Sequence, residues 1–501
     1  MTETMTAPVR RRAMRSGEVQ PVIPGFHPDP TICRVGDDYY LATSSFEYFP
    51  GAPIFHSRDL VSWTQLGNIL DRRSQFRLGR AAPSTGIYGS TLRFHDDRFW
   101  FVTTNVSDFG AGQLIVSAAD PSGPWDDPIW VPEAKGIDPD LCWDETGQAY
   151  LTWNDLAFGV GARGIVQAPV DLRTGRLLER SMLLWEGSGL PAAEGPHLYR
   201  IGEYWYLMIA EGGTERGHCV TVARSRSIRG RFEPCPANPI FTRRSTVHPV
   251  QSVGHADLVQ APDGSWAAVY LGSRPRGSTP GFHVLGRETF LAGVDWVDDW
   301  PVFDAGQFEV AVAATGFADS FTGAGFDPRW VVPGGEPASV AVPDSAGGIR
   351  FSGERPGLLC TRVCDFEWTA DAVVERGGSL SLRLDERHWC GVALHDGQAT
   401  VTVQIGDISQ ELASFSVGDT TVTLRIRAAD PTSPPVPVGD AGPDEIILAV
   451  GVGGSFTELA RLDGRYFSTE VAAGFTGRML AVGSPDPAGR ILSVCYRPGA
   501  S

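Results

Sequence analysis

TICRVGDDYYLATSSF, at residues 31–46, has the sequence pattern of a β-hairpin. A short strand enters a polar turn at Gly36 and an aromatic-rich strand leaves it; Gly and Asp are the residues that such turns require. The pattern returns in four further segments, at 91–106, 141–155, 197–213 and 257–273. The aromatic residues that mark the five copies are 50 to 61 residues apart, at Tyr40, Trp100, Tyr150, Trp205 and Trp266.

A second, weaker pair of strands follows the hairpins. In the first copy it is IFHSRDLVSWTQLG (54–67), and in the second copy it is QLIVSAADPSGPWDDPIW (113–130). A unit of about 50–60 residues with four strands is typical of a propeller blade. Five copies therefore predict a five-bladed β-propeller over residues 21–308.

The repeat ends near residue 308, and a different β pattern follows it. Residues 309–317 are predicted to be a linker, and residues 318–501 contain longer strands of alternating polarity, such as SLSLRLDERHWCGVALHD (379–396). Spaced strands with turns between them predict a β-sandwich, here concanavalin-like and interrupted by a Pro-rich loop at 430–443. With a disordered tail at 1–20, these segments predict an all-β chain.

The charge and composition limit the partners of the chain. Its 501 residues carry a formal net charge of −17 at pH 7, so we expect neither nucleic acid nor an anionic membrane as a partner. No run of 18 or more apolar residues occurs, and the Arg-rich N-terminus lacks the apolar segment of a secretory signal. We therefore expect a cytoplasmic protein, and a homo-oligomer is compatible with the sequence. The cysteines lack metal-binding spacing, which predicts reduced and mostly buried thiols.

Acidic residues recur at one position of the repeat, seven to nine residues before the hairpin turn. Asp29, Asp138, Glu194 and His255 occupy this position, and Tyr88–Gly89 occupies it in the second copy. The equivalent ends of the innermost strands of a propeller converge on one axis. Close carboxylates raise each other's pKa, and such an arrangement is usually kept for chemistry. Asp before a strand is also a common turn residue, but three acids at one register predict a catalytic site.

Five stretches of the sequence resemble the family 43 glycoside hydrolases, which act as β-xylosidases and α-L-arabinofuranosidases. The stretches are PVIPGFHPDPTICRVGDDYYLATSSFEYFPG (21–51), GIDPDL (136–141), EGPHLY (194–199), GHADL (254–258) and LGRET (285–289). The resemblance covers residues 21 to about 305 and extends to a C-terminal sandwich of the xylosidase-like type. It implies a five-bladed propeller that hydrolyses glycosides with inversion.

The resemblance also implies the catalytic roles. Asp29 is similar to the general base, Glu194 to the general acid, and Asp138 to the carboxylate that tunes the acid and orients the sugar. Inversion requires two carboxyls about 6.5–9.5 Å apart, so that a water fits between them. The acid needs a raised pKa to keep its proton near neutral pH, and repulsion from Asp138 would supply this rise. Asp140 is the alternative to Asp138, although the register of the repeat favours Asp138.

Four further residues resemble those that contact the substrate in this family. Phe46 and Tyr88 are expected to form pocket walls, and Arg287 to contact the sugar. His255 resembles the axial histidine that often faces a central calcium or other ion, here through water. The reaction itself is expected to require no cofactor, so that any calcium on the propeller axis would be structural. The plainer alternatives are core packing for the aromatic residues and the histidine, and a surface ion pair for Arg287.

These observations predict an exo-acting glycosidase that removes terminal pentose units, most of all β-D-xylose, from plant-type oligosaccharides. An α-L-arabinofuranosidase that uses the same site is the alternative. Related xylosidases often carry an aromatic–Ala–Pro–Asp run in the second blade, whereas this chain has GIYGSTLRF (86–94), so the preferred sugar stays open. A non-catalytic carbohydrate-binding propeller would have no use for three converging acids. A metal-dependent propeller such as a lactonase would need several ligands on one ion.

Overall fold

The computed structural model describes residues 19–76, 82–156, 164–351, 357–418, 420–431, 441–484, 486 and 489–499. Most of the predicted tail (1–20) and of the predicted Pro-rich loop (430–443) lies outside these residues. Within them the chain is nearly all β-strand, which confirms the predicted all-β class. The helices are short, namely η1 (Val106–Ala111), α1 (Pro337–Val340), η2 (Gly464–Phe467) and α2 (Thr469–Ala472). None of the described helices is long and apolar enough to cross a membrane.

The N-terminal half contains five antiparallel sheets in chain order, with four strands in a meander in each. The first sheet holds β1 (Thr31–Val35), β2 (Asp38–Ala42), β4 (Gly51–Ser57) and β5 (Thr64–Leu70), and the second holds β6 (Ile87–His95), β7 (Arg98–Asn105), β8 (Gln113–Ala118) and β9 (Ile129–Val131). The third holds β10 (Ile137–Trp143), β11 (Ala149–Asn154), β12 (Ile165–Asp171) and β13 (Arg176–Leu177), with β14 (Met182–Trp185) also on β12. The fourth holds β15 (Glu194–Ile201), β16 (Tyr204–Glu211), β17 (Cys219–Ser225) and β18 (Glu233–Pro234), with β19 (Phe241–Thr242) also on β17. The fifth holds β20 (Gln251–Gln260), β21 (Trp266–Ser273), β22 (Glu288–Val297) and β23 (Trp300–Asp304).

Each predicted hairpin forms the first two strands of one sheet. In the first copy, Thr31 pairs with Ala42 and Val35 with Asp38, and the turn between them contains Gly36 at φ 61°. Glycine adopts this left-handed conformation without the steric cost of a Cβ atom.

The first strands of the five sheets form a closed ring. β1 contacts β6, β6 contacts β10, β10 contacts β15, β15 contacts β20, and β20 contacts β1. Separate apolar clusters fill the spaces between neighbouring sheets. This arrangement brings the same end of all five first strands to one place.

The C-terminal half contains two antiparallel sheets that pack on a shared apolar core. One sheet has the order β26 (Ala341–Pro343), β27 (Ile349–Phe351), β38 (Arg490–Pro498), β29 (Trp368–Arg376), β34 (Val422–Ala429), β35 (Glu445–Val452) and β36 (Ser455–Asp463), with β24 (Phe317–Asp319) also on β38. The other has the order β28 (Leu358–Arg362), β37 (Met479–Gly483), β30 (Gly378–Arg383), β31 (His388–His395), β32 (Gln398–Ile405) and β33 (Ile408–Ser416).

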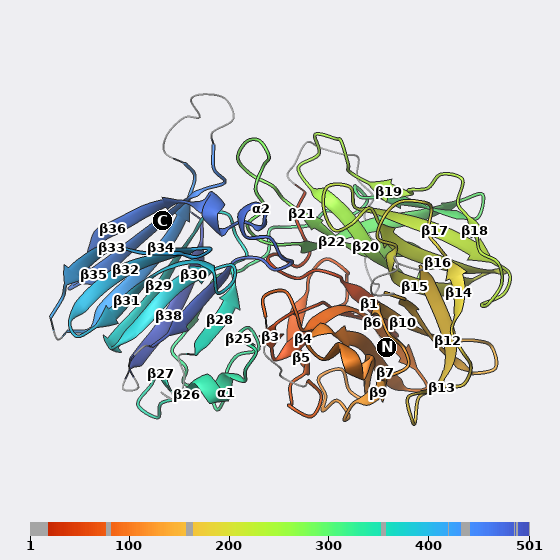
Figure 1. Ribbon diagram of the computed structural model, residues 1–501, viewed down its shortest axis with the longest axis horizontal. Helices are drawn as coiled ribbons and strands as arrows, with labels where there is room; N and C mark the ends of the chain where they lie inside the picture. The colour runs from red at the N-terminus through yellow and green to blue at the C-terminus, as the bar shows by residue number, and fades with distance from the viewer. Residues whose placement is uncertain are drawn as a thin grey trace, which may run out of the picture.

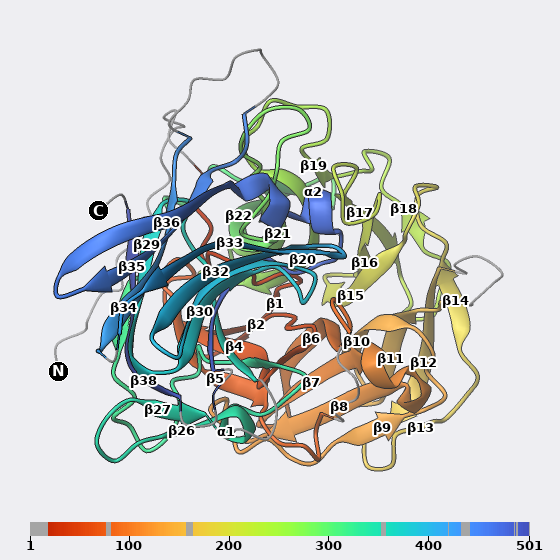
Figure 2. The ribbon, with the colours of Figure 1, turned by 60° about the vertical axis from the view of Figure 1, so that its left-hand side comes forward.

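The two halves lie side by side (Figures 1 and 2) and are joined by specific contacts. β3 (Tyr48–Phe49) of the N-terminal half pairs with β25 (Val332–Pro333) of the C-terminal half. Arg383 Nη1 donates to Tyr48 Oη at 2.9 Å across this boundary. The segment between β23 and β24 has no strand over residues 305–316.

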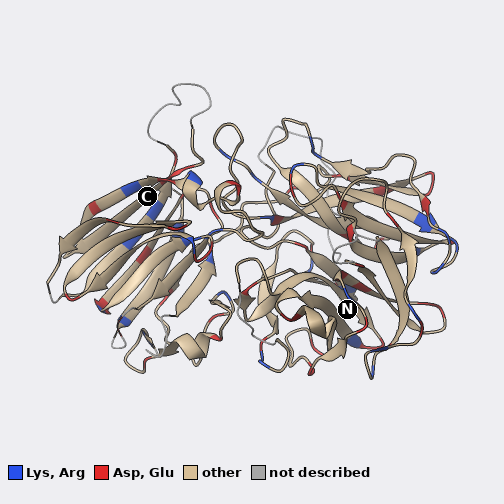
Figure 3. Ribbon diagram, in the orientation of Figure 1, with Lys and Arg blue, Asp and Glu red and all other residues tan. Residues whose placement is uncertain are grey.

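Charged residues of both signs are spread along the strands and loops of both halves (Figure 3). The acidic excess of the chain is therefore not gathered on one of its sheets.

Candidate active site

A cavity of about 330 Å³ lies where the first strands of the five N-terminal sheets meet. It brings together all of the residues predicted for the site, namely Asp29, Phe46, Tyr88, Asp138, Glu194, His255 and Arg287. An adjoining cavity of about 490 Å³ shares Arg287 with it but is lined by none of the three acids. The smaller cavity is therefore the candidate active site.

The backbone that carries these residues is strained in the same way in several sheets. Asp29, Asp138 and His255 have φ values of 52°, 54° and 46°, in the left-handed region that non-glycine residues seldom adopt. The pairing of β10, β15 and β20 with the next strand is interrupted by a bulge next to Asp138, Glu194 and His255, respectively. Bulges re-aim side chains, and strained residues of this kind gather at active sites at a cost of about 1–3 kcal/mol each.

Asp29 is the acid with the strongest ionic surroundings. Arg287 Nη1 donates to its Oδ1 at 3.1 Å, and Ser44 Oγ donates to its Oδ2 at 2.6 Å. Burial acts to raise its pKa, but the charges of Arg287 and His255 and the bond from Ser44 outweigh burial and hold the pKa below the usual value. Asp29 is therefore ionised across the physiological range, as a base that activates water must be.

Glu194 and Asp138 have the opposite tendency. Burial, followed by the charge of Asp29, raises the pKa of Glu194 to about 7. Burial, followed by the charge of Glu194, raises the pKa of Asp138 well above its usual value. The sequence predicts that repulsion from Asp138 raises the pKa of Glu194, but in the structure burial contributes most and the charge of Asp29 comes second.

The second sheet places a glycine where three others carry an acid and the fifth a histidine. A Cβ atom on Gly89 would lie 2.5 Å from Asp138 Oδ1 and 2.8 Å from His255 Cε1. The absence of a side chain at Gly89 therefore leaves room for both of these side chains.

Three aromatic rings form one wall of the cavity. Phe46 lies 5.0 Å from Tyr88 and 5.8 Å from Phe475 between ring centroids. Phe475 follows α2 in the C-terminal half, and its carbonyl oxygen accepts a bond from Arg287 Nη2 at 3.3 Å. Its own segment carries no signal for this role, because only the packing of the two halves brings it to the site.

His218 is a second residue that the sequence analysis missed. It lines the cavity, and its Nδ1 lies 3.1 Å from the carbonyl oxygen of Ser252. Burial lowers its pKa to about 4, so the ring is neutral near pH 7. His218 lies outside the repeated position before the hairpin turns, which explains why the repeat did not reveal it.

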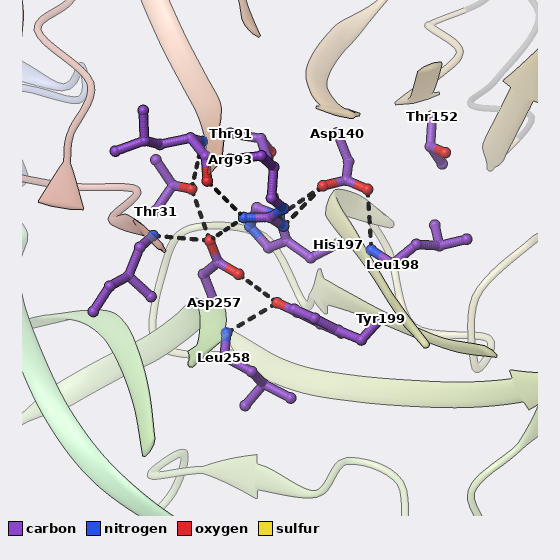
Figure 4. A network of polar contacts seen from close by, with 12 residues as sticks. Thr31, Thr91, Arg93, Asp140, Thr152, His197, Leu198, Tyr199, Asp257 and Leu258 are labelled. Atoms are coloured by element: carbon purple, nitrogen blue, oxygen red, sulfur yellow. Dashed lines mark hydrogen bonds and ion pairs between the residues drawn. The ribbon is translucent and has the colours of Figure 1, made fainter. Parts of the chain in front are cut away.

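A buried polar network joins all five first strands (Figure 4). Its residues Asp140 and Asp257 lie two positions after the cavity residues Asp138 and His255. Arg93 of β6 donates to Asp140 of β10 and to Asp257 of β20, in both cases at 2.9 Å. Asp257 also accepts bonds from Thr31 of β1 and Tyr199 of β15. Asp140 is thus paired in the network and does not line the cavity, whereas Asp138 does.

The expected axial ion can be compared with the residues present. Among the described residues, no group of three or more His, Cys, Asp or Glu is placed to hold a metal ion. His255 Nδ1 faces Asp29 Oδ1 at 3.5 Å, while the carboxylates further along the strands are paired with Arg93. Calcium prefers six to eight oxygen ligands, so these residues do not fit a directly bound calcium ion. An ion held by His255 through water stays a prediction.

The chain is similar in sequence and structure to several known glycosidases. A xylosidase/arabinosidase of Butyrivibrio fibrisolvens is 47% identical over 57% of this chain and 56% of that protein. A non-reducing end α-L-arabinofuranosidase of Bacteroides ovatus is 45% identical over 56% of this chain and 52% of that protein. The chain thus spans about half the length of these curated relatives. The crystal structure of a xylan β-1,4-xylosidase from Bacillus halodurans is 27% identical and superposes with a TM-score of 0.85 over 96% of this chain and all of that one. The profile of the glycosyl hydrolases family 43 matches residues 19–301, more than half of the sequence, and the chain therefore belongs to that family.

Proposed function

We propose that this chain is an exo-acting glycosidase that removes terminal pentose units, above all β-D-xylose, from plant-type oligosaccharides with inversion. The observation that carries this proposal is the meeting of Asp29, Asp138 and Glu194 in one cavity, with the pKa of one acid lowered and those of the other two raised. Carboxyl groups whose pKa values are driven apart are the usual basis for assigning acid and base.

In the proposed reaction, the ionised Asp29 takes a proton from water, which attacks the anomeric carbon. Glu194 gives its proton to the leaving oxygen, and Asp138 orients the sugar. The cavity of about 330 Å³ is near the small end of ligand pockets, which run from about 300 to 1,000 Å³. This size suits one terminal sugar ring, held against Phe46, Tyr88 and Phe475 and by Arg287.

An α-L-arabinofuranosidase is the second candidate, supported by the name of the Bacteroides ovatus relative. A non-catalytic carbohydrate-binding protein is disfavoured, because three buried acids that share one cavity are costly without a reaction to use them.

We propose the following architecture for this activity. The five N-terminal sheets form a five-bladed β-propeller over residues 21–308, and residues 309–317 link it to a concanavalin-like β-sandwich at 318–501. The ring of contacts among β1, β6, β10, β15 and β20 supports the propeller, and the core shared by two sheets supports the sandwich. β24 begins at Phe317, the last residue of the proposed linker.

The test compares hydrolysis of an aryl β-D-xyloside with that of an aryl α-L-arabinofuranoside, with and without a chelator, because the proposed reaction needs no cofactor. Faster cleavage of the xyloside is expected, and α-xylose should be the first anomer in proton NMR spectra of early product. Early β-xylose, or transfer of xylose to added methanol, would show a covalent intermediate and overturn the inverting assignment. Cleavage of neither substrate would overturn the proposed function.

A further inference from the structure

One serine outside the cavity makes three hydrogen bonds that meet at the aromatic wall. The Ser84 amide donates to Glu47 Oε2 at 3.0 Å, and Ser84 Oγ accepts a bond from the Phe475 amide at 2.8 Å. Its carbonyl oxygen accepts a bond from Tyr88 Oη, also at 2.8 Å. Ser84 therefore holds two of the three wall residues directly, and one of these belongs to the C-terminal half.

The third ring is held through the next residue in the chain. Glu47 follows Phe46, is 2% exposed, and its carbonyl oxygen accepts a bond from the Gly334 amide at 2.8 Å. In the structure, its carboxylate ties the backbone of Ser84 to the segment that carries Phe46.

The backbone is in the left-handed region at both ends of the bond between Ser84 and the Phe475 segment. Ser84 has φ 59° although it carries a Cβ atom, a strained conformation for a residue other than glycine. Gly474, which precedes Phe475, has φ 89°, and a Cβ atom there would lie 2.6 Å from Ser84 Oγ. A glycine at 474 is therefore needed for the C-terminal loop to reach Ser84.

We propose that Ser84 is a positioning residue: it sets the distance and orientation of Phe475 against Phe46 and Tyr88, and thereby the fit of the sugar in the catalytic cavity. This inference rests on the proposed function. In this proposal the Ser84 hydroxyl group holds Phe475 of the C-terminal half against the sugar pocket of the N-terminal half.

Replacing Ser84 by Ala or by Gly tests the hydroxyl in two backbone contexts. Both variants lose the acceptor for the Phe475 amide, so KM for the pentoside should rise about three- to ten-fold with kcat nearly unchanged, as for a contact made equally in ground and transition states. Glycine relieves the strain at φ 59°, so Ser84→Gly should melt no lower than Ser84→Ala. Ser84→Asn, which tolerates a positive φ and carries an acceptor oxygen, should restore part of the affinity.

Ser245 offers a matched control, because it is a serine at φ 60° that lines neither cavity described above. Ser245→Ala and Ser245→Gly should leave KM unchanged. If the rise in KM followed the melting temperatures of the Ser84 variants, with Ser84→Gly close to wild type, Ser84 would be merely structural. An unchanged KM in both Ser84 variants would overturn the proposal.

Hydrogen exchange separates this proposal from the proposed function. Exchange of the Phe475 amide, followed by mass spectrometry of a peptide that contains residues 473–477, should accelerate in Ser84→Ala and not in Ser245→Ala. This measurement needs no turnover, so it would still test the contact if neither pentoside were cleaved. Equal exchange in wild type and Ser84→Ala would show that the bond does not hold the loop.

Discussion

At the scale of single residues, the site depends on how burial and neighbouring charges set the pKa values of the three acids. Arg287 lies 3.1 Å from Asp29 and is itself only 7% exposed, so its charge is poorly screened and keeps Asp29 ionised. For Glu194, burial and the charge of Asp29 both favour the neutral form, and the charge of Arg287 does not outweigh them. The result is a base and an acid in one cavity.

We predict a pH profile of kcat/KM with a falling basic limb near pH 7, where Glu194 loses its proton. The acidic limb should lie below the ordinary pKa of aspartate, since Asp29 must become protonated to stop the reaction and its pKa is lowered. Replacing Arg287 by Met removes the charge that lowers this pKa, so the acidic limb should move to higher pH. Measured profiles of the wild type and this variant check both limbs; an acidic limb that stays in place contradicts the assignment of Asp29.

Removal of each titrating group supplies the control. Glu194→Gln and Asp29→Asn should each lower kcat by about 10²- to 10⁴-fold while the far-UV circular dichroism stays native. Glu194→Gln should also abolish the basic limb. Near wild-type turnover of a natural glycoside by either variant is the opposing result.

At the scale of elements, the five first strands are joined at their centre by a buried charge network. Asp140 and Asp257 are fully buried, and the Arg93 guanidinium lies between them on a third strand. Unpaired carboxylates would be costly there, because their hydration is lost. The arrangement of the pocket-bearing strand ends therefore depends on one side chain from β6.

We predict that Arg93→Met lowers the free energy of unfolding by about 3–5 kcal/mol, since it leaves two buried carboxylates without their cation. Arg98→Met is the matched control on the neighbouring strand: Arg98 pairs with Asp126 at side-chain exposures of 38% and 59%, and exposed pairs contribute about 0–1 kcal/mol. Thermal and urea denaturation of both variants give the comparison. Equal losses in the two would mean that the central network contributes no more than a surface pair.

At the scale of the whole molecule, the C-terminal half completes the site. It supplies Phe475 to the cavity wall. Its residues Val331, Cys360, Met479 and Ala481 pack on Phe26, Phe46 and Tyr48 of the N-terminal half. Large apolar contacts of this kind resist separation, unlike the polar interfaces of mobile domains.

We predict that residues 1–308 expressed alone are poorly soluble or weakly active, because truncation exposes Phe26 and Tyr48 and removes Phe475. Any soluble fragment should show a KM at least as high as that of full-length Phe475→Ala, which lacks the ring but keeps the interface. Steady-state kinetics and melting curves of the fragment and of full-length Phe475→Ala test this prediction. A fragment with wild-type KM and melting temperature would identify the C-terminal half as an independent module.

Local physical rules in the sequence were enough to place much of this molecule. Turn chemistry and alternating polarity placed the hairpins, since both act over a few residues, and a repeat with one register placed Asp29, Asp138, Glu194 and His255 at equivalent strand ends. Phe475, the Arg93 network and the three bonds of Ser84 could not be found in this way. Apart from the bond between Ser84 and Tyr88, these contacts join residues tens to hundreds of positions apart, and they exist only once the sheets have closed into a ring and the two halves have packed. The identity of the acids is thus local information, whereas their pKa values and the closure of the pocket follow from burial and charge, which only the tertiary structure creates.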